Sequence, residues 1–217
     1  MNRIPLRARN KMDKERKRRL LIDSAKSLFV ERGYGNTTVD MITERAGVST
    51  GTFYIYFKSK SEVYKVFQDE GIDILTGMIK KAVANPSMSP ISKVTAAVKA
   101  YFRFYRECRE YFDLIAVISL GGQDELRERE SEIGRRIDDK TLILLREIEG
   151  VIKEGVDSGD FYPVDTWEVT NVLWGMLDGL IILSERDNVR VIELDIEELI
   201  KTALETAFYG FARRGKD

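Results

Sequence analysis

Histidine is absent from the sequence, cysteine occurs once and proline four times in 217 residues. Without histidine a protein lacks the commonest residue for proton transfer at neutral pH and a common zinc ligand. The single cysteine, Cys108, excludes an intrachain disulfide. In a helical pattern it is typical of a small buried hydrophobe, and a redox sensor is the alternative. The prolines, at residues 5, 86, 90 and 163, interrupt none of the long helical patterns.

Features of enzymes, secreted proteins and membrane proteins are missing as well. No apolar run approaches the ~18 residues of a membrane span, and the basic start lacks the apolar stretch of a signal peptide. The sequence contains no GxxxxGKS/T, GxGxxG or GxSxG motif. Gly121-Gly122-Gln123 matches the tripeptide of peptide release factors, but a break between two helices accounts for it. We therefore expect a cytoplasmic, non-enzymatic protein without a metal or a cofactor.

Charge is distributed unevenly along the chain. Residues 1–60 contain 14 Lys or Arg and 6 Asp or Glu, a net charge of +8, whereas the remainder contains 21 and 30, a net charge of −9. A basic first quarter on an otherwise acidic protein indicates a polyanionic partner at that end. Its most basic part, up to KERKRR at 14–19, is either a solvated tail with the exposed face of a first helix, or an arm that contacts phosphates or a minor groove.

Residues 37–60 have the pattern of a helix-turn-helix. The expected first helix is Val39–Ala46, preceded by two threonines that can cap it. Gly47 begins a tight turn, because glycine readily adopts the left-handed conformation that ends a helix. Ser49 or Thr50 can cap the second helix, TGTFYIYF. Apolar residues of the motif can form a miniature core: Val39, Ile42, Ala46, Val48, Phe53 and Phe57.

The same segment resembles the DNA-binding domain of tetracycline-repressor-like (TetR family) regulators. The matching stretches are AKSLFVERGYGNTTV (25–39), ERAGVSTGTFYIYF (44–57) and KSKSEV (58–63). Two positions depart from the family pattern: Thr43 stands where a small alanine is common, and Ile55 where a polar or aromatic residue often contacts DNA. The first departure suggests slightly looser packing. Isoleucine at the second position either does not read a base or contacts the methyl group of a thymine.

The resemblance implies a DNA interface made of two groups of residues. One group would lie against the phosphates: Thr38, Tyr54, Tyr56, Lys58 and Lys60. The other would face base edges: Thr50, Gly51, Thr52 and Ile55. The implied target is a double-stranded operator with inverted repeats. A homodimer would bind it with recognition helices about one helical turn, ~34–36 Å, apart.

Beyond this motif the sequence is helical almost throughout, with helices expected at 60–84, 91–109, 110–120, 123–157, 164–185 and 194–213. Loops or breaks are expected at 85–90, 121–122 and 158–163, and only 189–192 shows a short strand-like alternation. The predicted fold class is therefore all-α. A three-helix helix-turn-helix domain occupies residues 1–60, and a helical bundle for ligand binding and dimerisation occupies residues 61–217.

The last two expected helices have the composition of a dimer interface. The final one carries a broad apolar stripe, and the preceding one is apolar on most of its circumference. Two glycines four residues apart on that helix would allow another helix to approach closely. Two such helices from each of two subunits would make a four-helix interface, which the family resemblance also implies; completion of a monomer core is the alternative. The candidate interface residues are Gly175, Gly179, Leu199, Ile200, Ala203 and Phe208.

Aromatic residues are concentrated between the linker helix and the dimer helices, where two polar residues also interrupt an apolar helix. Such a mixture is typical of small-molecule pockets, although each aromatic residue taken alone is better explained by core packing. The resemblance also implies a pocket in this region, for an effector such as an acyl-CoA, a fatty acid or an aromatic compound. The candidate ligand-binding residues are Tyr101, Phe104, Tyr105, Tyr111, Phe112, Asn171, Trp174 and Asp178.

The function expected from these features is that of a ligand-responsive transcriptional repressor. The dimer would bind its operator, and the effector would tilt the linker helix 60–84 and change the spacing of the recognition helices. A co-repressor role of the effector stays open. The rival from another class is an architectural or partner-binding protein without an effector. Ligand-dependent thermal stabilisation would distinguish the two, because only a sensor gains stability from its ligand.

Overall fold

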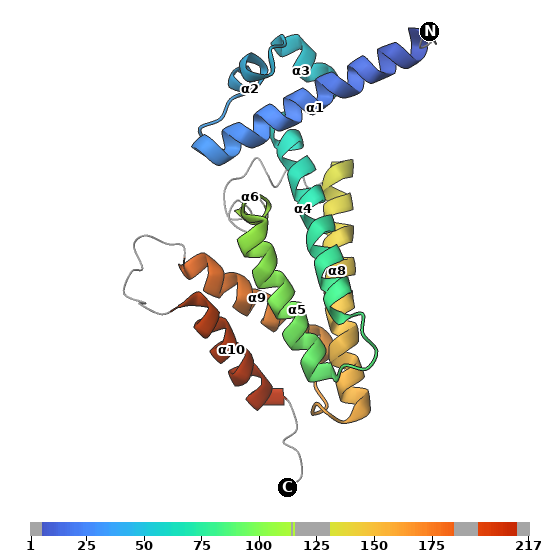
Figure 1. Ribbon diagram of the computed structural model, residues 1–217, viewed down its shortest axis with the longest axis vertical. Coiled ribbons are helices and arrows are strands. Elements are labelled where there is room, and N and C mark those ends of the chain that lie inside the picture. The colour runs from blue at the N-terminus through green and yellow to red at the C-terminus, as the bar shows by residue number, and fades with distance from the viewer. Residues whose placement is uncertain (1–5, 114, 116–130, 185–194, 212–217) are drawn as a thin grey trace. The chain divides into compact units, whose positions relative to one another are not determined.

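In a computed structural model, the chain folds into helices joined by loops (Figure 1). The residues that the structure describes are 6–113, 115, 131–184 and 195–211, and no strand occurs among them. The all-α class is confirmed. The helices are α1 (Leu6–Arg32), α2 (Val39–Ala46), α3 (Thr50–Tyr56), α4 (Lys60–Val83), α5 (Pro90–Glu107), α6 (Arg109–Phe112), α8 (Glu132–Ser158), α9 (Thr166–Ser184) and α10 (Ile196–Phe211).

The helix boundaries follow the sequence pattern closely where local signals are strong. α2 has the predicted bounds, and the loop between α4 and α5 falls at 84–89. The helix expected at 91–109 begins one residue earlier and ends at Glu107, where Cys108 separates it from the short α6. The helix expected at 123–157 is described from Glu132. The break at 121–122 and the strand-like stretch at 189–192 lie outside the described residues.

The chain forms two compact units, residues 1–70 with 121–137 and residues 71–120 with 138–217. Helices α4 and α8 contribute residues to both units. These units are defined by contacts within the chain and not by function. The predicted division after residue 60, between a DNA-binding and an effector-binding domain, therefore stays a prediction.

The first unit is built around the second half of α1. Leu21, Ala25, Leu28 and Phe29 are buried there at helical spacing, which places them on one face. The ring of Phe29 makes edge contacts with the aromatic residues of early α4, Tyr64 and Phe67. Burial of these side chains supplies the main favourable contribution to the stability of this unit.

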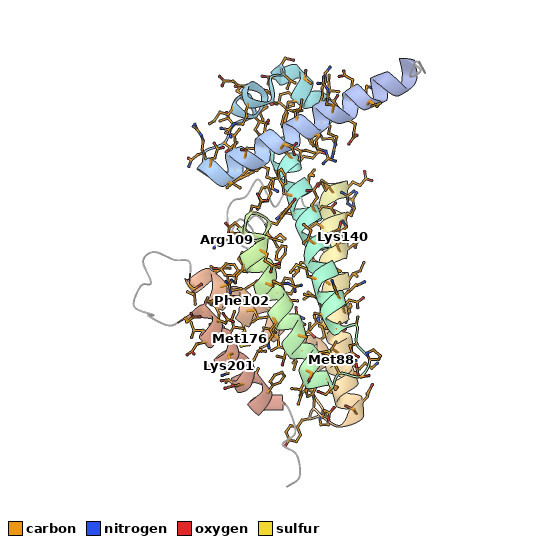
Figure 2. The ribbon with its side chains drawn as sticks, in the orientation of Figure 1. Met88, Phe102, Arg109, Lys140, Met176 and Lys201 are labelled. Carbon is orange, nitrogen blue, oxygen red and sulfur yellow. The ribbon has the colours of Figure 1, made fainter. Side chains whose placement is uncertain are left out.

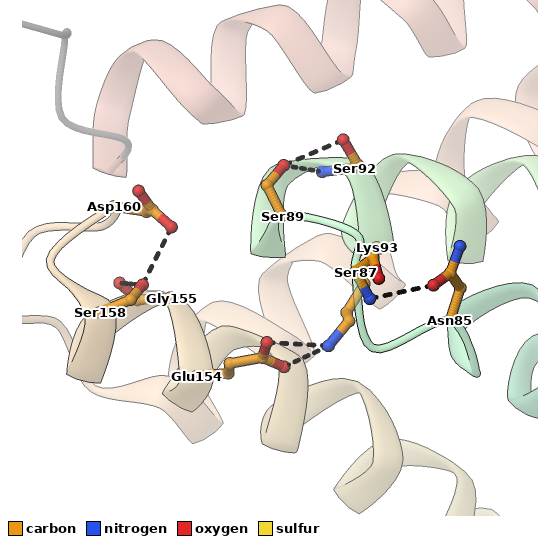
Figure 3. Close-up of polar contacts among 9 residues, drawn as sticks. All are labelled: Asn85, Ser87, Ser89, Ser92, Lys93, Glu154, Gly155, Ser158 and Asp160. Carbon is orange, nitrogen blue, oxygen red and sulfur yellow. Dashed lines mark hydrogen bonds and ion pairs between the residues drawn. The ribbon is translucent and has the colours of Figure 1, made fainter.

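The second unit surrounds an apolar core made by α4, α5, α8, α9 and α10. Ser89 caps α5 by accepting the N–H of Ser92 at 3.3 Å, and Pro90 occupies the first turn, where its missing N–H costs no hydrogen bond. The buried Lys93 binds both carboxylate oxygens of Glu154 at 2.7 and 2.8 Å, which ties α5 to α8 (Figure 3). A buried ammonium without such a partner would carry a large desolvation cost.

The end of α8 makes the tightest approach in this unit. Phe161 is fully buried, and its backbone N–H donates to the carbonyl of Gly155 at 2.9 Å. A Cβ atom at position 155 would lie 2.2 Å from the Phe161 ring. Glycine is therefore required at this point of α8 so that the chain can fold back onto the helix.

Candidate DNA-binding surface and effector cavity

Local hydrogen bonds fix the turn between α2 and α3. Thr38 caps α2, accepting the N–H of Met41 at 3.3 Å, and Gly47 ends it with φ = 66°. The N–H of Val48 then donates to the carbonyl of Thr43 at 3.0 Å. Ser49 caps α3 by accepting the N–H of Thr52 at 3.3 Å. The predicted helix-turn-helix is confirmed down to its capping residues.

Polar side chains hold this motif against α1. Arg45 on α2 binds both carboxylate oxygens of Glu31 on α1, at 2.6 and 2.7 Å. The hydrogen bonds from Arg45 lower the pKa of the Glu31 carboxyl below its usual value. The buried Thr37 donates its hydroxyl hydrogen toward the carbonyls of Leu28 and Gly33, 3.3 and 2.9 Å away. These contacts hold α2 and the loop before it against α1.

Lys60 contributes to the same scaffold. Its ammonium donates to the carbonyls of Tyr34 and Thr37, both at 2.7 Å, and lies 4.1 Å from the centroid of the Tyr34 ring. The predicted phosphate contact of Lys60 would have to share the ammonium with these carbonyls. Lys58, by contrast, has an exposed side chain. Sequence reasoning missed the internal role of Lys60, because its partners lie 26 and 23 residues away.

The outer face of α3 is open and unusually apolar. Tyr54 is 57% exposed and Ile55 73% exposed, whereas Phe53 on the opposite face is completely buried. Gly51 is also exposed, and its nearest surrounding side-chain atom would lie 3.8 Å from an added Cβ. Protein surfaces do carry single apolar residues. Here, however, the aliphatic side chain lies beside an exposed tyrosine on a rigidly held helix.

The other predicted DNA-contacting residues are placed around this face. The hydroxyl of Thr50 donates to the Asp40 carboxylate at 3.0 Å, and the Thr52 hydroxyl lies 3.0 Å from that of Ser49. Tyr56 is half-buried and Thr38 exposed. Thr43, where looser packing was expected, is buried, with its hydroxyl bonded to the carbonyl of Asp40 at 3.0 Å. Contacts of any of these residues with DNA stay predictions.

The second unit contains a small, almost purely apolar cavity. It has a volume of about 40 Å³, far below the roughly 300–1,000 Å³ of ligand pockets. A ligand of ordinary size would therefore have to push the surrounding helices apart. The cavity is lined by Ile79, Val94, Ala97, Val98, Tyr101, Leu145, Ile148, Thr170, Leu173, Trp174 and Leu177.

Two of the eight predicted ligand-binding residues, Tyr101 and Trp174, line this cavity. Four of the others belong to the surrounding aromatic packing: Phe104, Tyr105 and Phe112 are buried, and Tyr111 is half-buried. Asn171 is exposed, and its amide donates to the carbonyl of Trp167 at 2.7 Å. Sequence reasoning missed the aliphatic lining, because those residues have the composition of an ordinary core.

Asp178 forms a polar cluster with the two aromatic residues that line the cavity. The Tyr101 hydroxyl donates to its carboxylate, and a side-chain hydrogen bond from Trp174 supports it. Burial raises the pKa of the Asp178 carboxyl, an effect that the hydrogen bonds from Tyr101 and Trp174 oppose. Burial, followed by the nearby carboxylate, raises the pKa of Tyr101 well above its ordinary value. The hydroxyl of Thr170 is also engaged, donating to the carbonyl of Thr166 at 2.7 Å.

The residues predicted at a dimer interface fall into two groups. Gly175 is exposed and Gly179 half-buried, and among the described residues no other group lies within 4 Å of a Cβ added to either. Val172, on the same helix, is 66% exposed. By contrast, Ile200 is buried in the core of its own chain and is not available to a partner in this arrangement. Leu199, Ala203 and Phe208 are half-buried.

An open groove of about 730 Å³ runs between α5 and α10, which the sequence did not indicate. Its apolar part includes Val98, Phe102, Ile200 and Leu204, and charged residues of both signs border it. Figure 2 shows Phe102 on α5 and Lys201 on α10, which both line this groove.

Residues 21–74 match the family described as bacterial regulatory proteins, tetR family. These residues form a DNA-binding domain of the TetR family. The matched residues include α2, α3 and the part of α1 that packs on them. The chain is accordingly a DNA-binding transcriptional regulator and not an enzyme.

Two named relatives and one solved structure extend the likeness beyond residues 21–74. The fatty acid metabolism regulator protein of Bacillus subtilis is 25% identical over 162 residues, 73% of this chain and 78% of the relative. The activator FasR of Mycolicibacterium smegmatis is 31% identical over 106 residues, 49% of this chain and 48% of the relative. The fatty acid degradation regulator FadR from Bacillus halodurans shares the fold, with a TM-score of 0.66, 24% identity and coverage of 89% and 95% of the two chains.

Two further observations concern the described residues only. None of their helices combines the length and the apolar character that a bilayer crossing requires. They also contain no group of three or more His, Cys, Asp or Glu side chains that could hold a metal ion.

Proposed function

We propose that this protein is an effector-responsive repressor whose homodimer binds a palindromic operator through α3. The observation that carries the proposal is the open face of α3, where Tyr54 and Ile55 are exposed on a helix that Ser49 caps and the buried Phe53 anchors. An exposed aliphatic side chain on a recognition helix suits apolar contact with the C5-methyl group of thymine in the major groove. Gly51 leaves the backbone accessible at the start of the same helix.

Dimerisation is proposed through α9 and α10. The open face of α9 combines exposed Val172 with two glycines, and no other described part of the chain lies within 4 Å of a Cβ added to either. Glycine inside a helix costs roughly 1 kcal/mol relative to alanine, so close approach of a partner helix would offset this loss. A two-fold dimer would present its two recognition helices to the two halves of an inverted repeat.

The effector is proposed to bind at the apolar cavity beside Tyr101 and Trp174, in an enlarged form of that cavity. An uncharged hydrocarbon body suits the lining, because the hydroxyls of Tyr101 and Thr170 are already engaged. Two similar proteins are named as regulators of fatty acid metabolism or degradation, which supports an acyl compound as the first candidate. Effector binding would tilt α4, and a coupling of about 1–3 kcal/mol would weaken operator binding roughly 5–150-fold.

The first experiment is selection of bound duplexes from a random library, followed by titration of the enriched site. We expect the selected site to be a palindrome that contains a thymine contacted by Ile55. The variant Ile55→Ala should bind this site more weakly and should lose the preference for thymine at that position. Val30→Ala is the matched control, since Val30 is a similarly exposed aliphatic residue on α1, and should leave both unchanged. Binding of all duplexes alike would overturn the proposal and favour an architectural protein.

Effector response is tested on the enriched operator. Acyl-CoA, free fatty acid and a neutral aromatic compound are each added to the preformed complex and to the free protein. A repressor should release DNA and gain thermal stability with the same compound. Tighter DNA binding on addition of the compound would instead indicate a co-repressor. A compound that stabilises the protein and leaves operator affinity unchanged would contradict effector control.

A further inference from the structure

Helix α1 extends well beyond the part that packs on the helix-turn-helix. Its described side chains begin at Met12, and burial among them begins at Leu21. The match to the TetR family also begins at residue 21. The preceding residues of α1, Leu6–Leu20, are therefore an extension that the family match does not cover. At 1.5 Å per residue, these 15 residues add about 22 Å of helix.

The extension is basic, and its charges are ordered by the helical repeat. Residues 6–20 contain eight Lys or Arg and two Asp or Glu. Arg7, Lys11, Lys14 and Arg18 follow one another at spacings of four, three and four residues, which places these positions on one face. The same spacing continues into buried residues of α1, Ile22, Ala25 and Phe29. The basic stripe, defined as these four cationic positions, is thus in line with the face that packs on the first unit.

The two acidic residues of the extension offset only part of its positive charge. Asp13 is paired with Arg16 at 3.2 Å and with Lys17 at 3.0 Å, and the helical repeat places these three residues away from the stripe. Hydrogen bonds from Lys17 and Arg16 lower the pKa of the Asp13 carboxyl. Glu15 borders the stripe, and Lys11, Arg18 and Arg19 stand at i−4, i+3 and i+4 from it.

The extension leaves the first unit beside the recognition helix. The guanidinium of Arg18 lies 5.3 Å from the centroid of the Phe57 ring, and Phe57 directly follows α3 as its C-cap residue. The N-terminal part of α1 continues beyond α3 (Figure 1). A charged rod at this place would run alongside DNA held by α3.

We propose that the extension Leu6–Leu20 binds the DNA phosphates flanking the bases that α3 contacts, through the basic stripe. A row of cations at intervals of one helical turn complements the regular charges of a nucleic-acid backbone. An α-helix with side chains is about 10–12 Å wide, whereas the minor groove is about 6 Å wide, so the helix stays on the backbone. Its length corresponds to roughly six base pairs at 3.4 Å each. The inference rests on the proposed operator binding by α3.

The test compares two triple variants of the full chain with equal changes in charge. Arg7→Ala/Lys11→Ala/Lys14→Ala removes the stripe and keeps Arg18, which contacts Phe57. Arg9→Ala/Arg16→Ala/Arg19→Ala removes three cations from other faces. Alanine preserves helix propensity in both. The readout is the slope of log binding constant against log salt concentration on the enriched operator and on a random duplex, together with the length of DNA protected from cleavage.

We expect the stripe variant to lose roughly 0.9 of slope for each phosphate contact removed, about 3 per bound subunit. The slope should fall equally on both duplexes, because phosphate contacts carry no sequence information, and the protected length should shorten at its outer ends. The other variant should change the slope by less than half as much. If the slope changed equally in the two variants, net charge alone would explain the effect, and the proposal would be overturned. Loss of self-association in the stripe variant would assign the extension to a protein contact instead.

Failure of the proposed operator binding gives a different result. In that case the wild-type protein shows no preference for the enriched duplex over the random one, and this result does not depend on how binding varies with salt concentration. An intact preference with identical slopes for wild type and stripe variant would leave operator binding in place and remove the extension from the interface.

Discussion

The two compact units differ in how they hold their functional parts. In the first, charged and polar side chains bond to backbone groups and to each other across the helix-turn-helix, as Lys60 and Arg45 do. In the second, apolar packing dominates, and the half-buried carboxylate of Asp178 is held by the hydroxyl of Tyr101 and the indole of Trp174. Directional bonds fix the position of a surface such as the face of α3. Apolar packing is non-directional and leaves the walls of a cavity able to adjust.

The sharpest test of the packed unit is Gly155→Ala. The added methyl group would lie 2.2 Å from the Phe161 ring, so we expect a loss of about 1–3 kcal/mol in the free energy of unfolding. Gly150→Ala is the matched control on the same helix, because nothing lies within 4 Å of its Cβ. The control should gain up to about 1 kcal/mol. Denaturant titration measures the free energy of unfolding of both variants. A change of the same sign in the two variants would refute the close approach of Phe161 to Gly155.

The corresponding test of the polar unit is Lys60→Met. Loss of the ammonium leaves the carbonyls of Tyr34 and Thr37 without this donor, which we expect to cost about 1–3 kcal/mol and to weaken operator binding by displacing α3. Lys58→Met, at an exposed site, should keep the stability and lose only its own DNA contact. Thermal unfolding and operator titration separate the two effects. A stable Lys60→Met variant with normal structure would contradict the scaffold role.

A smaller effect is expected from the pH dependence of the second unit. Burial raises the pKa of Asp178 above its ordinary value of 3.8, so the folded protein holds this proton more tightly than the unfolded chain does. The contribution of Asp178 to stability therefore falls as the pH rises from about 4 through the raised pKa. Asp178→Asn should flatten the pH dependence of the melting temperature over that range. Asp157→Asn, at an exposed position of α8, is the comparison that should not.

The smallest effect on folding, with a clear effect on binding, is expected from Gly51→Ala. Its Cβ would meet the nearest surrounding side-chain atom at an ordinary 3.8 Å, so stability should change by less than about 1 kcal/mol. Operator affinity should fall several-fold, because the methyl group would stand between the backbone of α3 and the DNA. Unchanged affinity on the enriched operator would remove Gly51 from the interface.

The parts of the structure that depend on short-range signals could be predicted from the sequence. Thr38, Gly47 and Ser49 act within a few residues of their positions, so the turn and its caps follow from residue type. The need of Asp178 for a buried partner could also be foreseen, but its partner Tyr101, 77 residues away, could not be singled out among the aromatic residues.

The rest of the candidate site depends on contacts that composition does not specify. The aliphatic residues lining the cavity, such as Val94 and Leu177, are chemically the same as those that fill the core. The sequence therefore predicted a chamber of aromatic residues, of which only two line the cavity. In the same way, a lysine on a helix near DNA suggests a phosphate contact, whereas the fold gives Lys60 two backbone carbonyls.

The approach of Phe161 to Gly155 also constrains how this protein can change over time. A side chain at position 155 can be accommodated only if the residue at position 161 is smaller. A smaller residue at position 161 leaves a cavity unless position 155 carries a larger residue. Neither substitution is tolerated well before the other, so the two positions are expected to change as a pair across descendants of this sequence. A lineage that keeps glycine at 155 should therefore keep a large aromatic residue at 161.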